Sequence, residues 1–98
     1  MELGFVGLGR MGANMVRRLH KGGHRCHIFS PSAGTREGLA EETGAISFAD
    51  LSALVRSLPQ PRVIWVMVPE GEATQSVLTE LRQLCAPGDV IVDGGNSH

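Results

Sequence analysis

The spacing of hydrophobic residues changes repeatedly along the chain, and each change marks a new predicted element. Residues 3–6 form a short apolar run that predicts a buried strand. From residue 10 to residue 21, hydrophobic side chains recur every four positions, which is the spacing of one helix face. A pair of glycines at 22–23 should end that helix, and residues 25–30 predict a second strand. Strand, helix and strand therefore fit within the length of one βαβ unit.

The next third of the chain predicts shorter elements. Residues 31–38 are small and polar, so we expect a loop that opens a second helix ending near Gly44. Residues 45–48 predict a weak third strand. Asp50 is a suitable N-cap for a short helix, which the prolines at 59 and 61 should end.

The last third contains the most hydrophobic segment. Residues 63–68 (VIWVMV) show no alternation of apolar and polar positions, which is typical of a central parallel strand buried on both faces. A helix should follow Pro69, because apolar residues return at helical spacing up to Leu84. After a turn at 87–89, residues 90–92 predict a fifth strand. Strands that alternate with helices indicate an open parallel α/β sheet.

Composition restricts the class of protein further. The chain has 98 residues, 42% of them hydrophobic, and a net charge of −1, which fits one small globular domain without electrostatic attraction to nucleic acid or anionic membranes. Its longest apolar run has six residues, far short of the ~20 needed to span a bilayer. Cys26 and Cys85 form no C-x-x-C pair, so we expect reduced thiols and a cytoplasmic location.

Three of the 13 glycines form the pattern G-x-G-x-x-G at Gly7, Gly9 and Gly12. The pattern follows a predicted strand and opens a predicted helix, as the dinucleotide-binding fingerprint requires. In that fingerprint the first glycine permits a tight turn, the second lets the backbone approach a pyrophosphate, and the third lets the helix lie close to the strand. The alternative is a glycine-rich turn that only packs a helix on a strand. The dinucleotide interpretation predicts a Rossmann-like sheet of about five strands in the order 3-2-1-4-5, with helices on both faces.

The end of the second strand bears on the choice of cofactor. NAD-selective sites usually place an acid there, which binds the ribose 2′-hydroxyl. This chain has Ser30 at that place and no acid before Glu37, which favours NADP or tolerance of both cofactors. Arg36 and Arg10 are the nearest cations for a 2′-phosphate, although either side chain could instead be a solvated surface residue.

Two further segments follow strands at the same predicted edge of the sheet, at residues 68–71 and 93–97. Ligands of open α/β sheets bind beyond the carboxyl ends of the strands. Asn96 offers both a hydrogen-bond donor and an acceptor there. Alternatively, Asn96 or Ser97 only caps a following helix.

Three segments, residues 7–15, 61–69 and 93–97, together resemble decarboxylating 6-phosphogluconate dehydrogenases. The first segment alone also suits the wider β-hydroxyacid dehydrogenase group, including hydroxyisobutyrate dehydrogenases and tartronate semialdehyde reductases. Those relatives usually carry a Ser-Thr type segment where this chain has DGGNS. The resemblance covers essentially all 98 residues, but only the first part of the family's protein. It implies that residues 1–98 are the N-terminal part of a dinucleotide-binding domain.

The resemblance implies oxidative decarboxylation of 6-phosphogluconate to ribulose 5-phosphate, with hydride transfer to NADP or NAD. The implied cofactor-binding residues are Gly7, Leu8, Gly9, Arg10, Met11, Gly12, Ser30, Pro31, Ser32, Val68, Pro69, Glu70 and Asn96. Asn96 would also contact the substrate, a phosphorylated sugar acid. The NADP-dependent members usually have Asn-Arg-Ser/Thr at the end of the second strand, whereas this chain has Ser30-Pro31-Ser32.

The family's general-base lysine and general-acid glutamate lie well downstream, so we assign no catalytic residue and no metal ligand to this chain. His20, His24 and His27 are expected to be structural or solvated, with His27 on the surface of its strand. Two alternatives stay open: another β-hydroxyacid dehydrogenase, and a freestanding nucleotide-binding module without catalysis. The exposed edge of the strand at 90–92, or the remainder of the family's protein, would support a homo-oligomer.

Overall fold

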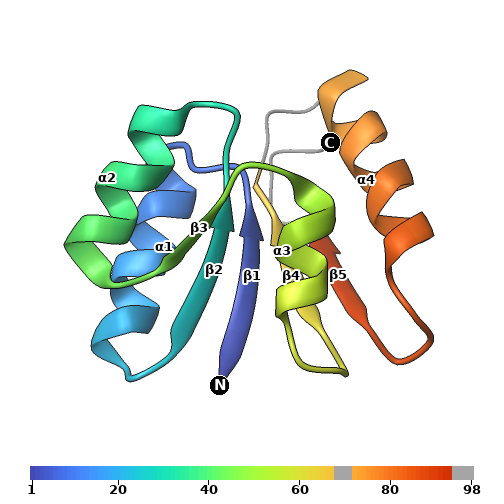
Figure 1. Cartoon of the computed structure of the whole chain (residues 1–98), viewed down its shortest axis with the longest axis horizontal. Coiled ribbons are helices and arrows are strands. Elements are labelled where there is room, and N and C mark those ends of the chain that lie inside the picture. Colours follow the sequence, from blue (N-terminus) through green and yellow to red (C-terminus); the bar gives the residue numbers. More distant parts are fainter. Residues whose placement is uncertain (68–71, 94–98) are drawn as a thin grey trace.

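The computed structural model describes residues 1–67 and 72–93. These residues form a five-stranded parallel sheet in the order β3-β2-β1-β4-β5 (Figure 1), which confirms the predicted topology. The strands are β1 (Glu2–Val6), β2 (Arg25–Phe29), β3 (Ile46–Phe48), β4 (Val63–Val66) and β5 (Val90–Asp93). The helices are α1 (Arg10–Lys21), α2 (Ala33–Thr43), α3 (Leu51–Ser57) and α4 (Glu72–Leu84).

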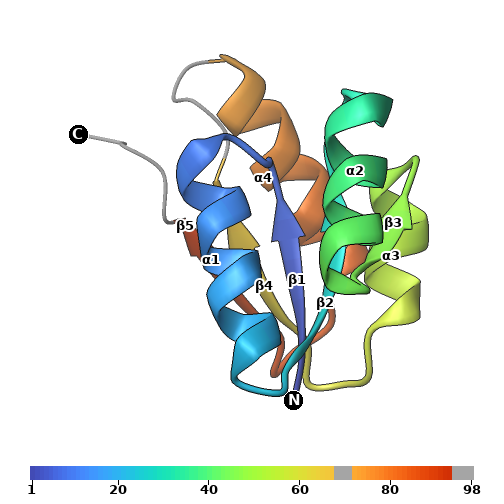
Figure 2. The same ribbon diagram turned by 90° about the vertical axis from the view of Figure 1, so that its left-hand side faces the viewer.

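The helices cover the two faces of the sheet in pairs, as expected. Helices α1 and α2 lie on one face and α3 and α4 on the other (Figures 1 and 2). Each face has its own hydrophobic cluster. The α1 side is centred on buried residues that include Phe5, Val16 and Ile28. The α3 side is centred on buried residues that include Leu54 and Ile64.

The side chains of β1 explain how one strand serves both clusters. Phe5 points to the α1 side, where its ring stacks on Trp65 of β4 with centroids 6.4 Å apart and planes 10° apart. Gly4 and Val6 face the α3 side. A Cβ atom on Gly4 would lie 2.9 Å from Leu58 Cδ1, so glycine at this position lets the end of α3 approach the centre of the sheet.

The boundaries of the elements agree with local capping rules. Helix α2 begins at Ala33 because the Ser32 hydroxyl accepts a hydrogen bond from the Thr35 N–H; its start therefore lies inside the segment expected to be a loop. It ends at Thr43 and is followed by Gly44 at the C-cap, whose φ of 80° favours glycine. Asp50 caps α3, as predicted, by accepting a hydrogen bond from the Ala53 N–H. Strand β4 ends at Val66, earlier than the predicted end at residue 68.

His27 corrects one expectation. It is not a surface residue, because its side chain is only 2% exposed. The ring stacks on Phe48, its Nε2 lies 2.7 Å from a Glu2 carboxylate oxygen, and its Nδ1 lies 2.7 Å from the Ser57 hydroxyl. The Ser57 hydroxyl also donates to the Leu54 carbonyl, so the ring links the start of β1 to the end of α3.

A second polar group closes the same, amino-terminal end of the sheet. Asp89 precedes β5, and its side chain is 1% exposed. One carboxylate oxygen accepts the Arg62 N–H at 2.7 Å, while the other accepts the Ala86 N–H at 2.8 Å and the Arg62 guanidinium at 2.9 Å. These hydrogen bonds hold the pKa of the Asp89 carboxyl below its ordinary value of 3.8. The two backbone N–H groups have the larger effect and the guanidinium the smaller one.

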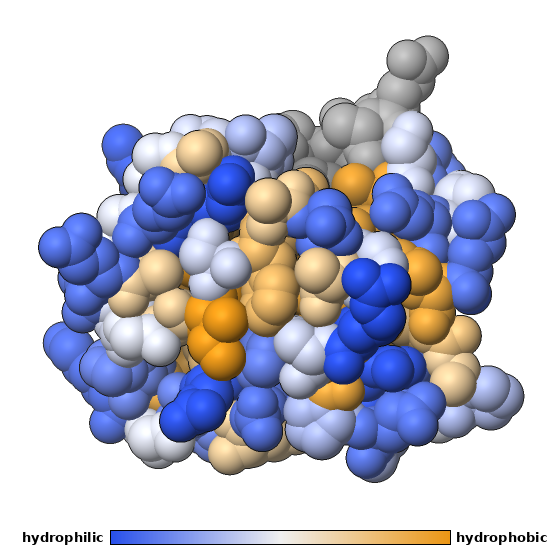
Figure 3. All heavy atoms as spheres, viewed as in Figure 1, coloured by the Kyte–Doolittle hydropathy of each residue, from blue (hydrophilic) through white to orange (hydrophobic). Residues whose placement is uncertain are grey.

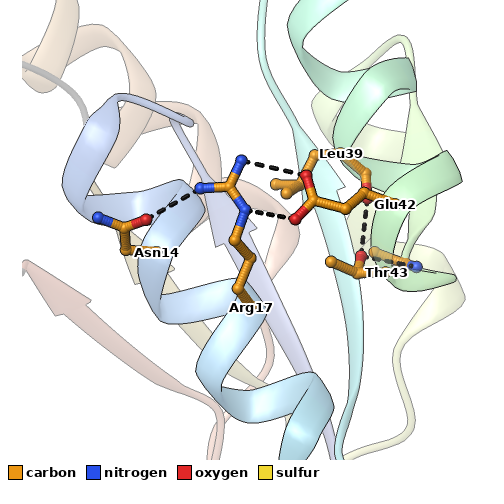
Figure 4. Close-up of polar contacts among 6 residues, drawn as sticks. Asn14, Arg17, Leu39, Glu42 and Thr43 are labelled. Atoms are coloured by element: carbon orange, nitrogen blue, oxygen red, sulfur yellow. Dashed lines mark hydrogen bonds and ion pairs between the residues drawn. The ribbon is translucent and has the colours of Figure 1, made fainter.

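An exposed ion pair joins helices α1 and α2. The Arg17 guanidinium of α1 donates to the Glu42 carboxylate of α2 at 2.7 Å and to the Asn14 side-chain oxygen at 2.9 Å (Figure 4). The hydrogen bond from Arg17 lowers the pKa of Glu42. The face shown in Figure 3 is mostly hydrophilic, with small separate hydrophobic areas. Among the residues that the structure describes, no helix is both long and apolar enough to cross a membrane.

Candidate functional site

The glycine loop connects the carboxyl end of β1 to the start of α1. Gly7 has a φ of 96°, which favours glycine, and its N–H donates to the Phe29 carbonyl at 2.9 Å. A Cβ atom on Gly12 would lie only 2.7 Å from the Gly7 carbonyl oxygen, so α1 packs closely on the loop. A Cβ atom on Gly9, in contrast, would meet no atom of the described residues within 4 Å, apart from its own chain neighbours. The three glycines thus provide a tight turn, an open approach and a close helix–strand contact.

The first turn of α1 carries groups that attract an anion. Gly9 occupies the N-cap position, no side chain caps the helix, and its first turn contains no acidic residue. The leading N–H groups of a helix have no acceptor within the helix, and the helix dipole adds partial positive charge at this end. A phosphate group beside Gly9 would satisfy both features.

The other predicted residues of this loop present different atoms to a ligand. Leu8 is buried in the cluster on the α1 side, so its backbone rather than its side chain is available. The side chains of Arg10 and Met11 are exposed. The loop therefore offers mainly backbone groups, with one exposed cation at the start of α1.

The carboxyl end of β2 lies beside the glycine loop, because the Gly7 N–H bonds to Phe29. The hydroxyl of buried Ser30 accepts the Ser32 N–H at 3.3 Å. The Arg36 guanidinium reaches back from the first turn of α2 and donates to the Ser30 carbonyl at 3.1 Å. Pro31 and Ser32 are exposed. This end of the strand thus brings together two hydroxyl groups and a cation.

Thr35 belongs to this group, although the sequence analysis did not select it. Its hydroxyl donates to the Ser32 hydroxyl at 3.0 Å. The signal that could have identified it is the spacing Ser-x-x-Thr, in which the first hydroxyl caps the helix and the second lies one turn later.

Four of the predicted cofactor-binding residues, Val68, Pro69, Glu70 and Asn96, lie outside the described residues. The strands that lead to them are described. Val6 pairs with both Phe29 and Val66, and Val66 pairs with Asp93, so the carboxyl ends of β2, β1, β4 and β5 form one row. Parallel α/β sheets bind ligands at such a row.

Known proteins of similar sequence also indicate a dinucleotide-binding domain. Residues 2–98 match the family described as the NAD binding domain of 6-phosphogluconate dehydrogenase. The NAD(+)-dependent, decarboxylating 6-phosphogluconate dehydrogenase of Haloferax volcanii is 41% identical over 98 residues, covering 100% of this chain and 32% of that protein. The decarboxylating enzyme of Bacillus licheniformis is 35% identical, covering 98% of this chain and 21% of that protein.

Solved structures of similar fold were also found. The 6-phosphogluconate dehydrogenase of Plasmodium falciparum superposes with a TM-score of 0.92 at 20% identity, over 100% of this chain and 22% of that one, which supports the fold alone. The 3-hydroxyisobutyrate dehydrogenase of Mycobacterium tuberculosis superposes with a TM-score of 0.84 at 28% identity, over 96% of this chain and 31% of that one.

The chain spans between about a fifth and a third of the length of the curated relatives it matches. The family match nevertheless extends over nearly every residue of the chain. It includes the glycine loop and the ends of all five strands. The chain belongs to the family of NAD-binding domains of 6-phosphogluconate dehydrogenases.

Proposed function

We propose that this chain binds NADP or NAD along the carboxyl edge of its sheet and serves the oxidative decarboxylation of 6-phosphogluconate to ribulose 5-phosphate. The observation that carries the proposal is the contrast between Gly9 and Gly12. Among residues 1–67 and 72–93, space is open around Gly9, where a pyrophosphate must approach the backbone, and is closed at Gly12, where the helix must approach the strand.

The cofactor, when bound, accepts a hydride from the substrate. The residues of this chain bind and orient it. Backbone N–H groups of the loop 7–12 hold the pyrophosphate, and the segment 30–32 borders the adenosine ribose. Val68, Pro69 and Glu70 pass beside the cofactor, and Asn96 contacts the nicotinamide end and the phosphorylated sugar acid.

The proton transfers of the reaction need groups from outside this chain. A general base would remove the proton of the substrate hydroxyl during oxidation, and a general acid would protonate the product after loss of CO₂. The family's lysine and glutamate for these steps lie downstream. We therefore expect the isolated chain to bind the cofactor but not to catalyse the reaction.

Binding is tested by calorimetric titration of the chain with NADP and with NAD. Gly9→Ala should weaken binding of the preferred cofactor at least about tenfold, because the added methyl group displaces the pyrophosphate from the helix N-terminus. The thermal midpoint should not fall, since the methyl group meets no atom within 4 Å. Gly38→Ala, in open space on α2, is the matched control and should leave binding unchanged. No saturable binding of either cofactor at millimolar concentration would contradict the proposal.

The reaction is tested in a chimera. This chain replaces the matching third of the Haloferax volcanii enzyme, to which it aligns over its whole length. The chimera should reduce the cofactor in the presence of 6-phosphogluconate, and Asn96→Ala should raise the KM for that substrate. A chimera that folds and binds the cofactor but reduces none of it would favour a freestanding nucleotide-binding module.

The similarity to 3-hydroxyisobutyrate dehydrogenase favours one alternative substrate class, the smaller β-hydroxyacids. The polypeptide that carries this chain should oxidise 6-phosphogluconate and not 3-hydroxyisobutyrate. The opposite preference would assign it to the wider dehydrogenase group instead.

Location and assembly complete the proposal. A cytoplasmic location agrees with two cysteines that form no disulfide. We place a homo-oligomeric contact at the outer edge of β5, where Val90 is 49% exposed, or in the remainder of the protein. Light scattering on the chain tests the first of these: a monomer at high concentration would exclude the edge contact.

A further inference from the structure

We propose that the α1 side of strands β4 and β5 binds an acidic amphipathic helix from the remainder of the polypeptide that carries this chain. The contact lies outside the candidate cofactor site. An apolar sheet face, a continuous groove beside α1 and an excess of positive charge along that groove carry the proposal.

The two faces of β4 and β5 differ in how far helices cover them. On the α3 side, Ile64 of β4 is fully buried. On the α1 side, Val63 and Trp65 of β4 lie beside their register partners Val90 and Val92 of β5, and we call these four residues the β4–β5 face. Val90 is 49% exposed, and none of the four is fully buried by residues 1–67 and 72–93. Because parallel sheets are normally covered by helices on both faces, this face has room for a further helix.

A groove connects the β4–β5 face to helix α1. One hollow of about 450 Å³ is lined by Trp65 of β4 and by Met15 and Arg18 of α1. A second hollow of about 670 Å³ follows α1 from Arg10 to Lys21 and shares Met15 and Arg18 with the first. The shared residues make the two hollows one groove along α1, whose 12 residues span about 18 Å. A helix of about three turns has the same length.

Large hydrophobic side chains gather along this groove. Four of them are exposed in the described part of the chain, and Met1, Met11 and Val90 lie in the groove or on the β4–β5 face. Exposed apolar side chains that lie together mark an interaction surface, and flexible thioether side chains adapt to the shape of a partner. The groove therefore fits a helix with an apolar stripe.

Every charged residue that lines the groove in the described part of the chain is basic. Residues 10–25 contain five of the nine lysines and arginines of the chain and no acidic residue. Arg17 pairs with Glu42 of α2, but Arg18 and Lys21 have no ion-pair partner among residues 1–67 and 72–93. Acidic side chains that flank the apolar stripe of the docked helix would pair with these two cations.

Charge and length together indicate where the helix comes from. A second copy of this chain is disfavoured, because a two-fold contact would place α1 against α1 and oppose like charges. The chain spans only 32% of one curated relative and 21% of another, so most of their length lies outside the matched part. A helix in the same polypeptide also binds at a high effective concentration, so a shallow groove is sufficient to hold it.

Calorimetric titration of the 98-residue chain with a synthetic helix tests the chemistry. The probe is a peptide of about 18 residues with leucine at every third or fourth position, glutamate on both flanks of that stripe and alanine elsewhere. It should bind saturably at submillimolar concentration. The same peptide with lysine in place of glutamate should bind at least about tenfold more weakly, because it opposes Arg18 and Lys21. Equal binding of the two peptides, or no binding of the acidic one, would overturn the inference.

Charge reversal on α1 locates the contact. Arg18→Glu with Lys21→Glu should raise the Kd of the acidic peptide at least about tenfold and lower that of the lysine peptide. Arg56→Glu with Arg82→Glu is the matched control, because both residues lie exposed on the helices of the opposite face, and it should change neither Kd. Arg18→Gln alone is a milder change that should raise the Kd of the acidic peptide about threefold and serves if the double variant unfolds. An unchanged Kd in the α1 variants would place the peptide elsewhere and overturn the inference.

The full-length polypeptide tests the source of the helix. The acidic peptide should not bind there, because the polypeptide's own helix occupies the groove. Arg18→Glu with Lys21→Glu should lower the thermal midpoint of the full-length polypeptide more than that of the 98-residue chain. Equally tight binding of the peptide to both would overturn the assignment to the remainder of the polypeptide. A chain that binds the acidic peptide but neither cofactor would support this inference and contradict the proposed function.

Discussion

The two ends of the sheet differ in whether their polar groups have hydrogen-bond partners within the protein. At the amino-terminal end, His27 is bonded through both ring nitrogens, and Asp89 accepts three hydrogen bonds. At the carboxyl end, α1 begins without a side-chain cap, and a Cβ atom on Gly9 would meet nothing within 4 Å in the part of the chain that the structure describes. Groups that are satisfied by the protein stabilise the fold, whereas groups left without a protein partner are available to a ligand. The amino-terminal end of the strands thus contributes mainly to stability, and the carboxyl end mainly to ligand binding.

The starts of the first three helices make the same distinction within one type of element. Ser32 caps α2 and Asp50 caps α3, each by accepting a backbone N–H. Helix α1 alone among these three has glycine at its N-cap position and therefore no side-chain acceptor. Glycine in place of a capping side chain costs a helix roughly a few tenths of a kcal/mol. That cost falls on the helix that would hold a pyrophosphate.

The largest effect on stability and binding together should come from Gly12, which lies at the carboxyl end of the sheet and packs α1 on the loop. Gly12→Val would place its Cβ atom 2.7 Å from the Gly7 carbonyl oxygen, so α1 must move away from the loop. We expect a loss of about 3 kcal/mol in the free energy of unfolding together with loss of cofactor binding. Urea denaturation and calorimetry measure the two effects.

Gly38→Val is the control for Gly12→Val, because a Cβ atom there meets nothing within 4 Å. It should leave cofactor binding unchanged and should not lower stability, because valine has a higher helix propensity than the glycine it replaces. Unchanged stability of Gly12→Val would show that the helix does not depend on this close contact.

Asp89→Asn should have the next largest effect and should act on stability alone. The amide can no longer accept on both sides, so at least one of the donors from Arg62 and Ala86 loses its partner. We expect a loss of about 2 kcal/mol. Asp50→Asn is the matched control, since asparagine caps a helix as well as aspartate does.

The contribution of Asp89 should also depend on pH. Its folded pKa lies below the ordinary value of 3.8, so folding is favoured by the ionised carboxylate. That stabilisation is fully present above 3.8 and is lost as the pH falls through the folded pKa. The difference between the unaltered chain and Asp89→Asn should therefore be constant near neutral pH and shrink in acid. A difference that grows in acid would contradict this assignment.

His27→Leu should have a smaller effect at the same end. Leucine keeps the apolar contact with Phe48 but leaves Ser57 without a ring partner, while Glu2 is 39% exposed and can turn to water. We expect a loss of about 1–2 kcal/mol and no change in cofactor binding. His20→Leu, on the exposed surface of α1, should change neither quantity. Weaker cofactor binding by His27→Leu would show that the two ends of the sheet are coupled.

Arg17→Ala should have the smallest effect. The ion pair with Glu42 is exposed on both sides, and such pairs contribute little because water and salt screen them. The urea midpoint should agree with that of the unaltered chain within error at high salt. A clear loss would identify the contact between α1 and α2 in Figure 4 as a structural clamp.

Hydrophobic periodicity was sufficient to predict the alternation of strands and helices, because each element buries residues at its own spacing. The order of the strands was predicted from the dinucleotide interpretation of the glycine pattern. Periodicity was not sufficient for His27, whose partners Glu2 and Ser57 lie 25 and 30 positions away in the chain. Nor could it predict the three hydrogen bonds of Asp89, which the sequence shows only as a turn. Contacts of this kind depend on tertiary distance, and no local pattern records them.

The candidate site was predictable to the extent that it is local. The glycine loop is a contiguous pattern, and the structure gives each of its three glycines a distinct environment. Arg36 could be nominated as a nearby cation, but its hydrogen bond to Ser30 requires the turn between β2 and α2 to fold first. Thr35 was missed because its hydroxyl meets the Ser32 hydroxyl only once the first turn of α2 has formed.

The stack of Phe5 on Trp65 gives the chain an optical probe of its own. The sequence contains one tryptophan, so the emission spectrum has a single origin. That indole lies on the contact between β1 and β4, two strands from distant parts of the chain, and Phe5 is only two residues from the glycine loop. Its emission therefore reports whether the centre of the sheet is assembled, without any label.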